Sequence, residues 1–194
     1  MSEPADRLAD VVIDLLVVDG FEGISVRRVA TAAGVSIGAV QHHFRTKDAM
    51  VEAAMRRVSE RFQERLDRQL SRVEEDPQHA LAVVCDELLG IGDEQRRASV
   101  IWLQRLARAA VDPAVANRHA EDWQQIEQLL AALVGLIRPD RTRTWHRERA
   151  AALLALLDGL AAAVVTEPDR MPSERARRLL GTELERLTRR DEPE

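Results

Sequence analysis

The sequence is poor in cysteine and aromatic residues, and each of these two scarcities narrows the range of possible folds. Its single cysteine, Cys85, cannot form a disulfide within the chain, so a small secreted fold held by disulfides is disfavoured. Aromatic residues account for 3% of the chain and tyrosine is absent, which disfavours an all-β sandwich or barrel. The 28 Lys and Arg residues are outnumbered by 33 Asp and Glu residues, and the net charge of −5 excludes a protein that is basic throughout.

A long hydrophobic run is also missing. The most apolar stretch, Ala150–Val165, contains Asp158 and falls short of the ~20 apolar residues that a membrane span requires. It is better explained as a buried helix. The first ten residues are polar and acidic, without the basic and apolar regions of a signal peptide. We therefore expect a soluble, cytoplasmic protein with no membrane partner.

The sequence is rich in helix-forming residues and is divided by recognisable helix boundaries. Apolar residues recur at helical spacing between Leu8 and Leu16, and similar stripes follow along the chain. Helix starts are expected at the N-cap residues Ser25, Ser36, Thr46, Asp76, Asp93, Asp112 and Ser173. Helix ends are expected at Gly20, Gly34, Gly90 and within Gly135–Asp140. This pattern predicts an all-α fold of nine helices, with long helices over 143–166 and 173–189, and no strand.

Residues 25–44 have the pattern of a helix-turn-helix, with two short helices joined at Gly34-Val35-Ser36. The segment from Ser25 to Lys47 carries four basic residues and no Asp or Glu, although the whole chain is acidic. A local charge of +4 suits a surface that must neutralise DNA phosphates. The outward face of the second short helix carries small and polar residues, which allow close approach to base edges in a groove.

Two other classes of protein stay open at this point. A helical corner can be purely structural, so an all-α interaction module or ligand carrier is the main alternative. An all-α enzyme is the third possibility, but the sequence has no Gly-rich phosphate loop, zinc-type His-Glu cluster or nucleophile elbow. Cys85 lies in the middle of a predicted helix and is expected to be an inert buried thiol. We therefore predict no catalytic residues, no cofactor and no enzymatic activity.

The residues at Gly20-Phe21, Ile24–Ala30, Ala33–Phe44 and Lys47 resemble the N-terminal DNA-binding region of the TetR family of transcriptional regulators. The resemblance covers about residues 8–55. It implies a nine-helix homodimer with a DNA-binding domain over 1–50 and a ligand-binding and dimerisation domain over 51–194. It also implies a repressor that binds a palindromic operator and is released by a small-molecule effector.

The resemblance assigns DNA contacts to residues of the helix-turn-helix. Base-facing or base-reaching positions are Arg27, Ile37, Gly38 and His42, and phosphate contacts fall at Ser25, His43 and Lys47. Arg28, Ser36 and Gln41 complete the predicted DNA-binding set. Gln41 stands where many members have Tyr, and it can instead pair with adenine. His42 and His43 diverge by ~100° on a helix, so the pair does not predict a metal site.

The C-terminal helices are too apolar for a lone surface hairpin, which predicts a dimer interface. The predicted interface residues are Leu153, Leu157, Asp158, Leu160, Leu180 and Leu184. For Asp158 we expect pairing with an Arg across the dimer, ahead of contact with a ligand or capping of a kink near Gly159. The predicted effector-binding residues are Phe62, Trp102, Trp123 and Glu87, with His119 as a further polar candidate. Core filling explains the two tryptophans equally well.

Overall fold

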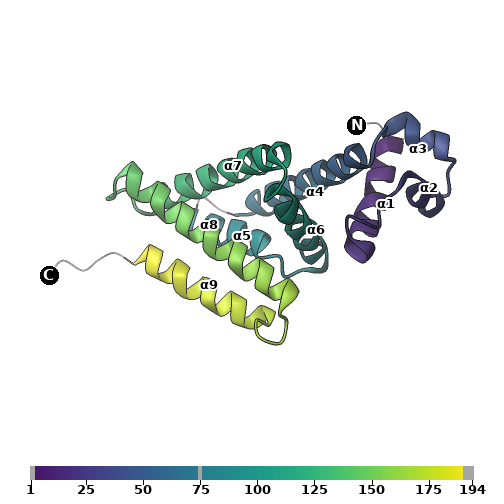
Figure 1. The fold of residues 1–194 in the computed structure, drawn as a ribbon. Coiled ribbons are helices and arrows are strands. Elements are labelled where there is room, and N and C mark those ends of the chain that lie inside the picture. The colour runs from purple at the N-terminus through teal and green to yellow at the C-terminus, as the bar shows by residue number, and fades with distance from the viewer. Residues whose placement is uncertain (1–2, 74–75, 190–194) are drawn as a thin grey trace. The chain divides into compact units, whose positions relative to one another are not determined.

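The computed structural model describes residues 3–73 and 76–189, and these form nine helices and no strand (Figure 1). The expected all-α class is confirmed. The helices are α1 (Glu3–Asp19), α2 (Val26–Ala33), α3 (Ile37–His43), α4 (Lys47–Leu70), α5 (Pro77–Leu89), α6 (Asp93–Ala109), α7 (Pro113–Ile137), α8 (Arg143–Thr166) and α9 (Ser173–Thr188).

The chain divides into two compact units. The N-terminal unit comprises Met1–Arg65 with Val100–Gln104, and the C-terminal unit comprises Leu66–Ser99 with Arg105–Glu194. The boundary expected at residue 50 falls inside the N-terminal unit, because α4 continues without a break and its first turns pack on α1 to α3. A short part of α6 also belongs to this unit.

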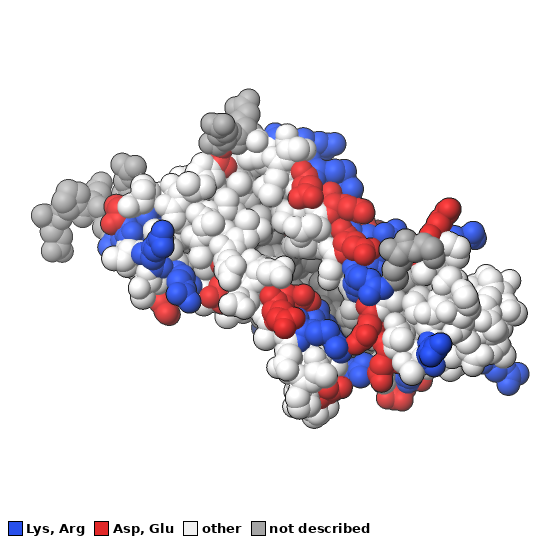
Figure 2. All heavy atoms as spheres, turned by 90° about the horizontal axis from the view of Figure 1, so that it is seen from above, with Lys and Arg blue, Asp and Glu red and all other residues white. Residues whose placement is uncertain are grey.

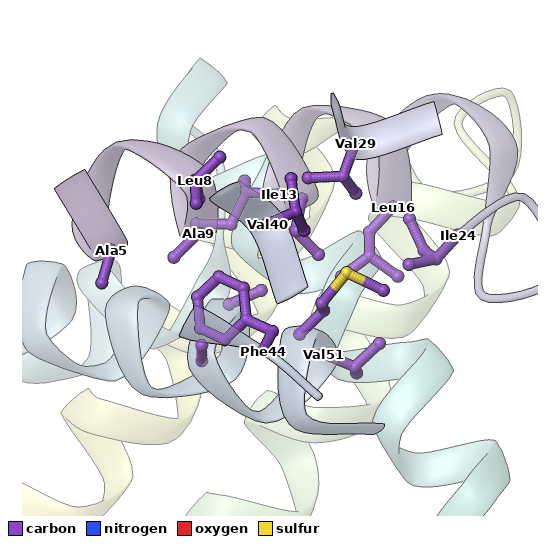
Figure 3. Close-up of a cluster of buried hydrophobic side chains, with 14 of the residues drawn as sticks. Ala5, Leu8, Ala9, Ile13, Leu16, Ile24, Val29, Val40, Phe44 and Val51 are labelled. Atoms are coloured by element: carbon purple, nitrogen blue, oxygen red, sulfur yellow. The ribbon is translucent and has the colours of Figure 1, made fainter. Parts of the chain in front are cut away.

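The N-terminal unit is built around one apolar core that fixes the orientation of α3 (Figure 3). Val12 and Leu16 from α1, Val29 from α2 and Val40 from α3 are each at most 1% exposed. Phe44 follows α3 and closes the core at 5% exposure. Val40 and Phe44 are one helical turn apart, as the sequence pattern predicted, and they anchor α3 by a single face.

Serine and threonine caps set the starts of three successive helices in this unit. Ser25, Ser36 and Thr46 accept hydrogen bonds from the backbone N–H groups of Arg28, Ala39 and Ala49 at 3.2, 3.1 and 3.0 Å. Gly34 ends α2 with φ of 66°, a left-handed conformation that glycine adopts without a Cβ penalty. The turn between α2 and α3 is therefore specified locally by Gly34 and Ser36.

Two caps expected in the C-terminal half are wrong. Asp93 lies inside α6, whose N-cap is Gly92 with no side-chain hydrogen bond, and Ser173 lies inside α9, whose N-cap is Pro172. Asp93 still has its negative charge in the first turn, where it interacts favourably with the helix dipole. The break expected within Gly135–Asp140 begins later than its first residue, because α7 continues through Gly135 to Ile137.

In the C-terminal unit α8 packs along α7, and both α5 and α9 pack against α8. By length and composition α8 could cross a membrane, since an 18-residue stretch of it has a mean hydropathy of 1.7. However, 44% of that stretch is buried inside the protein. Its buried residues include Leu153, Leu154, Leu157 and Leu160. This packing agrees with the buried helix that the sequence predicted for Ala150–Val165.

Candidate functional site

The α3 helix presents most of its surface to solvent. Val40 is its one buried residue, and the exposed residues are Ile37, Gly38, Ala39, Gln41 and His42. A Cβ added at Gly38 would meet only the Ser36 hydroxyl oxygen, at 3.9 Å, so this point of the helix faces open space. A short helix held by one buried face, with small and polar residues on the rest, can enter a groove of another molecule.

The acid-free segment of the sequence is not free of acids in space. Arg28 of α2 lies 2.5 Å from Asp19 at the end of α1, and the Lys47 ammonium lies 3.7 Å from Glu22. Lys47 also sits 4.1 Å from the centroid of the Phe21 ring. Asp19 and Glu22 both precede Ser25 in the sequence, so they lie outside the segment from Ser25 to Lys47 that contains no acidic residue. The charge that this surface offers to phosphates is consequently smaller than +4.

Arg27 and His42 are exposed polar residues of this unit, and His43 is half-buried beside His42. Arg27 is exposed, and its carbonyl oxygen accepts the Thr31 hydroxyl at 3.0 Å. The rings of His42 and His43 are 5.1 Å apart with an interplanar angle of 78°, an edge-to-face arrangement. Seen from above in Figure 2, the right-hand end of the picture, where Figure 1 places α1 to α3, is mostly uncharged surface with separate basic and acidic groups.

Two family models match the chain in the same order as these structural units. Residues 10–54 match the model of bacterial regulatory proteins of the tetR family, and residues 77–189 match the C-terminal model of BetI-type transcriptional repressors. The chain belongs to the TetR family of transcriptional regulators. The helix-turn-helix inferred from the sequence lies within the first match.

Individual TetR relatives agree with this assignment. The BetI regulator of Burkholderia cenocepacia is 30% identical over 79% of this chain and 78% of its own length. The crystal structure of a transcriptional regulator from Rhodococcus sp. Rha1 matches with a TM-score of 0.81 and 34% identity, covering 96% of each chain. A regulator from Saccharomonospora viridis, solved in complex with choline, has the same fold, with a TM-score of 0.81, 20% identity and 95% and 97% coverage.

Most of the residues predicted for a TetR-type dimer interface are buried within the single chain. Leu153, Leu157, Leu160 and Leu180 are between 1% and 5% exposed, so they have almost no surface left for a second subunit. Leu184 is half-buried. Leu179, expected to point inward, is 43% exposed, so that expectation is wrong. The exposed apolar side chains on α8 and α9 are small ones and Leu179, because the larger apolar groups are mostly used in the core.

The four predicted effector residues are divided between the two units. Phe62 and Trp102 belong to the N-terminal unit, whereas Glu87 and Trp123 belong to the C-terminal unit. Glu87 is 5% exposed and its Oε2 accepts hydrogen bonds from the Gln69 and Gln95 amides, at 3.1 and 3.2 Å. The carboxylate of Glu87 is therefore held by neighbouring side chains.

Trp123 and Asp158 do meet, across the α7–α8 packing. The indole Nε1 of Trp123 donates to both carboxylate oxygens of Asp158, at 2.9 and 3.2 Å. Burial raises the pKa of Asp158 to about 6, against the opposing effect of this hydrogen bond. The sequence had singled out both residues but had not paired them, since their separation of 35 positions carries no local signal.

Sequence reasoning missed Arg138, which is 3% exposed at the end of α7. Its guanidinium holds the Asp140 carboxylate with two hydrogen bonds of 3.0 Å, and it donates to the carbonyl oxygens of Leu187 and Arg189 at 3.5 and 2.8 Å. Arg138 therefore joins the α7–α8 turn to the end of α9. Nothing in the local sequence distinguishes this arginine from its exposed neighbours.

Proposed function

We propose that this TetR-family chain is a ligand-responsive repressor that binds a palindromic DNA operator as a homodimer. The exposed face of α3 is the observation that carries the proposal. Val40 is the one buried residue within this helix, and Gln41 and His42 are exposed on its outer side. Gln and His side chains at such positions can hydrogen-bond to base edges in the major groove.

Contacts to the phosphate backbone are assigned around this helix. Ser25 and Ser36 accept backbone N–H groups through their oxygens, which leaves each hydroxyl proton available to a phosphate. Arg27 is exposed and is assigned to a base or to the phosphates beside it. His43 and Lys47 flank the end of α3 and are assigned to phosphates. These groups orient α3 on the duplex, while the side chains of α3 read the sequence.

A second subunit is proposed to cover the outer faces of α8 and α9. On α8 the exposed positions include Ala152, Ala155 and Gly159, and on α9 they include Leu179. A Cβ added at Gly159 or Gly181 would meet nothing within 4 Å in one chain, so both glycines leave room for close helix approach. A two-fold dimer would present two α3 helices to a palindromic site.

The response to an effector is proposed to work as a shift between two arrangements of the dimer. A small molecule that binds the C-terminal unit more tightly in one arrangement favours that arrangement, and operator and effector then weaken each other's binding equally. The structure neighbour solved in complex with choline supports a small-molecule effector for this fold. The site of action is the cytoplasm, where the operator lies.

The test is operator selection from genomic DNA with purified full-length protein, followed by fluorescence anisotropy across a salt series. Specific binding whose affinity falls steeply with salt is expected, because phosphate neutralisation releases counterions. Arg27→Ala is expected to weaken binding and relax sequence preference, whereas Lys47→Ala should weaken all sequences by similar factors. If neither variant differs from wild type, or if affinity is independent of salt, the proposal is wrong and a carrier or interaction module is favoured.

A further inference from the structure

The turn between α7 and α8 and the first turns of α8 carry a concentration of arginines. Between positions 138 and 149 there are five arginines and two acidic residues, a local charge of +3 in a chain of net charge −5. Figure 2 shows basic groups, with a few acidic ones, at the left-hand end of the picture, where Figure 1 places this turn. The arginine cluster comprises Arg138, Arg141, Arg143, Arg147 and Arg149, of which the last three are exposed.

One aromatic ring, that of Trp145, lies among three of these guanidinium groups. The Cζ atoms of Arg138, Arg141 and Arg149 are 5.4, 5.6 and 5.5 Å from the centroid of the ring. A guanidinium at this distance from an indole is attracted by its π electrons and loses part of its side-chain freedom. Arg141 and Arg149 are therefore partly ordered before any partner binds, which lowers the entropic cost of binding one.

The acidic residues within the cluster do not neutralise it. Asp140 accepts two hydrogen bonds of 3.0 Å from Arg138, and its Oδ2 lies 3.4 Å from Nε of Arg141. The hydrogen bonds from Arg138 lower the pKa of Asp140 to about 2, so its single negative charge is fully present at neutral pH and is shared by two guanidiniums. Among the residues that the structure describes, the three exposed arginines of the cluster form no ion pair. The cluster therefore keeps a net positive charge that attracts an anionic partner.

The surroundings of the arginine cluster favour a short partner with carboxylates over a nucleic acid duplex. Guanidinium groups pair with carboxylates and with phosphates equally well, through two parallel hydrogen bonds. Glu148 is exposed between Arg147 and Arg149. Glu185 is exposed near the end of α9, which Arg138 holds by main-chain carbonyl oxygens. A duplex extends beyond the cluster, so its phosphates would lie near these carboxylates and be repelled.

An exposed leucine lies next to the arginine cluster in the sequence. Leu136 is 67% exposed in the last turn of α7, two residues before Arg138. An apolar side chain of a peptide can pack on Leu136 while neighbouring carboxylates of the same peptide pair with arginines. Clusters of arginines are a recurring means of recognising acidic motifs in peptides. A peptide therefore fits this surface better than a free anion does.

We propose that the arginine cluster docks a short acidic segment of another protein. The carboxylates of the segment pair with the guanidiniums of Arg141, whose side chain is 36% exposed, and of Arg149. An apolar side chain of the segment packs on Leu136. The cluster belongs to the C-terminal unit, whereas α3 belongs to the N-terminal unit, so the inference does not rest on DNA binding. It adds a protein partner to the operator and effector proposed above.

The experiment measures binding of a fluorescently labelled peptide to the full-length protein by anisotropy. The probe contains several glutamates and leucines, and in the neutral control peptide each glutamate is replaced by glutamine. The acidic peptide is expected to bind with an affinity that falls as salt rises, and the control peptide is not expected to bind. Arg141→Gln combined with Arg149→Gln is expected to weaken the acidic peptide by about tenfold or more.

A matched variant separates the arginine cluster from a general effect of charge. Arg68→Gln combined with Arg72→Gln removes two positive charges from exposed positions at and just after the end of α4, in the same unit. This variant should bind the acidic peptide as tightly as wild type does. Circular dichroism shows that both double variants are folded, and sedimentation velocity compares their oligomeric state with that of wild type.

Several results would overturn the inference. Equal or absent binding of both peptides, or unchanged binding in Arg141→Gln with Arg149→Gln, would show that the cluster does not recognise carboxylates. Weaker binding of a non-operator duplex by that variant, but not by Arg68→Gln with Arg72→Gln, would assign the cluster to nucleic acid. Dissociation into monomers would assign it to a second copy of this chain. Peptide binding that requires deletion of residues 190–194, three of which are acidic, would assign it to the chain's own end.

Discussion

Asp19, the last residue of α1, holds the guanidinium of Arg28 on α2 at 2.5 Å, with the two side chains 30% and 50% exposed. The pair connects consecutive helices of the DNA-binding unit. It also withholds one cation from the surface that carries α3.

Asp19→Asn is therefore expected to increase affinity for DNA. The substitution removes a negative charge and frees Arg28 for a phosphate, so the slope of log affinity against log salt should steepen by about one. Loss of an exposed ion pair costs about 0–1 kcal/mol, so the melting temperature should change little. Anisotropy at several salt concentrations measures the slope, with Asp169→Asn as the control for net charge. Weaker binding by Asp19→Asn would show that the ion pair orders the surface for DNA.

Gly38→Ala is expected to change stability and DNA affinity in opposite directions. Alanine in a helix is favoured over glycine by about 1 kcal/mol, and the added Cβ meets only the Ser36 hydroxyl oxygen at 3.9 Å. The melting temperature should therefore rise. On operator DNA the methyl group would lie between α3 and the groove, and affinity should fall by about tenfold. Calorimetry and anisotropy on one preparation measure both quantities. Unchanged affinity would place this side of α3 away from the duplex.

Leu179→Glu is expected to dissociate the dimer. Leu179 is 43% exposed in a single chain, so the charge should be tolerated in a monomer. In a two-fold interface the substitution occurs twice, and the dissociation constant should increase by at least about tenfold. Leu136→Glu on α7, where the leucine is 67% exposed, is the matched control. Sedimentation velocity measures the oligomeric state. A dimer that stays intact with Leu179→Glu would place the interface elsewhere.

The stability of the protein should depend on pH through Asp158. Its pKa is raised to about 6 from 3.8 by burial, so between these values the folded protein binds more protons than the unfolded chain. The contribution of Asp158 to stability is therefore unfavourable above about pH 6 and becomes more favourable as the pH falls toward about 4. Asp158→Asn should melt higher than wild type near neutral pH, and the difference should shrink in acid. A difference that is constant with pH would contradict this assignment.

The fold could be predicted well where its signals are local. Asp76-Pro77 and Asp112-Pro113 mark the starts of α5 and α7, and Asp76 and Asp112 accept the N–H groups of the first turn. Ser36 and Gly34 specify the turn before α3 in the same way. The N-cap residue was predicted wrongly for α6 and α9, whose N-caps are Gly92 and Pro172. A helix can start one residue earlier than expected without a side-chain hydrogen bond at its N-cap.

The sequence could predict which residues of the candidate site are exposed, but it could not predict which side chains form pairs. Exposure of Gln41 and His42 follows from the helical period, once Val40 and Phe44 are assigned to the core. The partners of Arg28 and Trp123 come from other helices, and their choice depends on packing that no local pattern encodes. For the same reason the apolar faces of α8 predicted burial correctly but could not tell the core from a dimer interface.

Arg138 contacts its distant partners through main-chain carbonyl oxygens, those of Leu187 and Arg189. Every amino acid carries such an oxygen. The side chains at positions 187 and 189 can therefore change during evolution while the guanidinium of Arg138 keeps its hydrogen bonds to the main chain there. Homologues would then show a fixed arginine opposite a variable stretch, and methods that search for correlated substitutions would not detect the link.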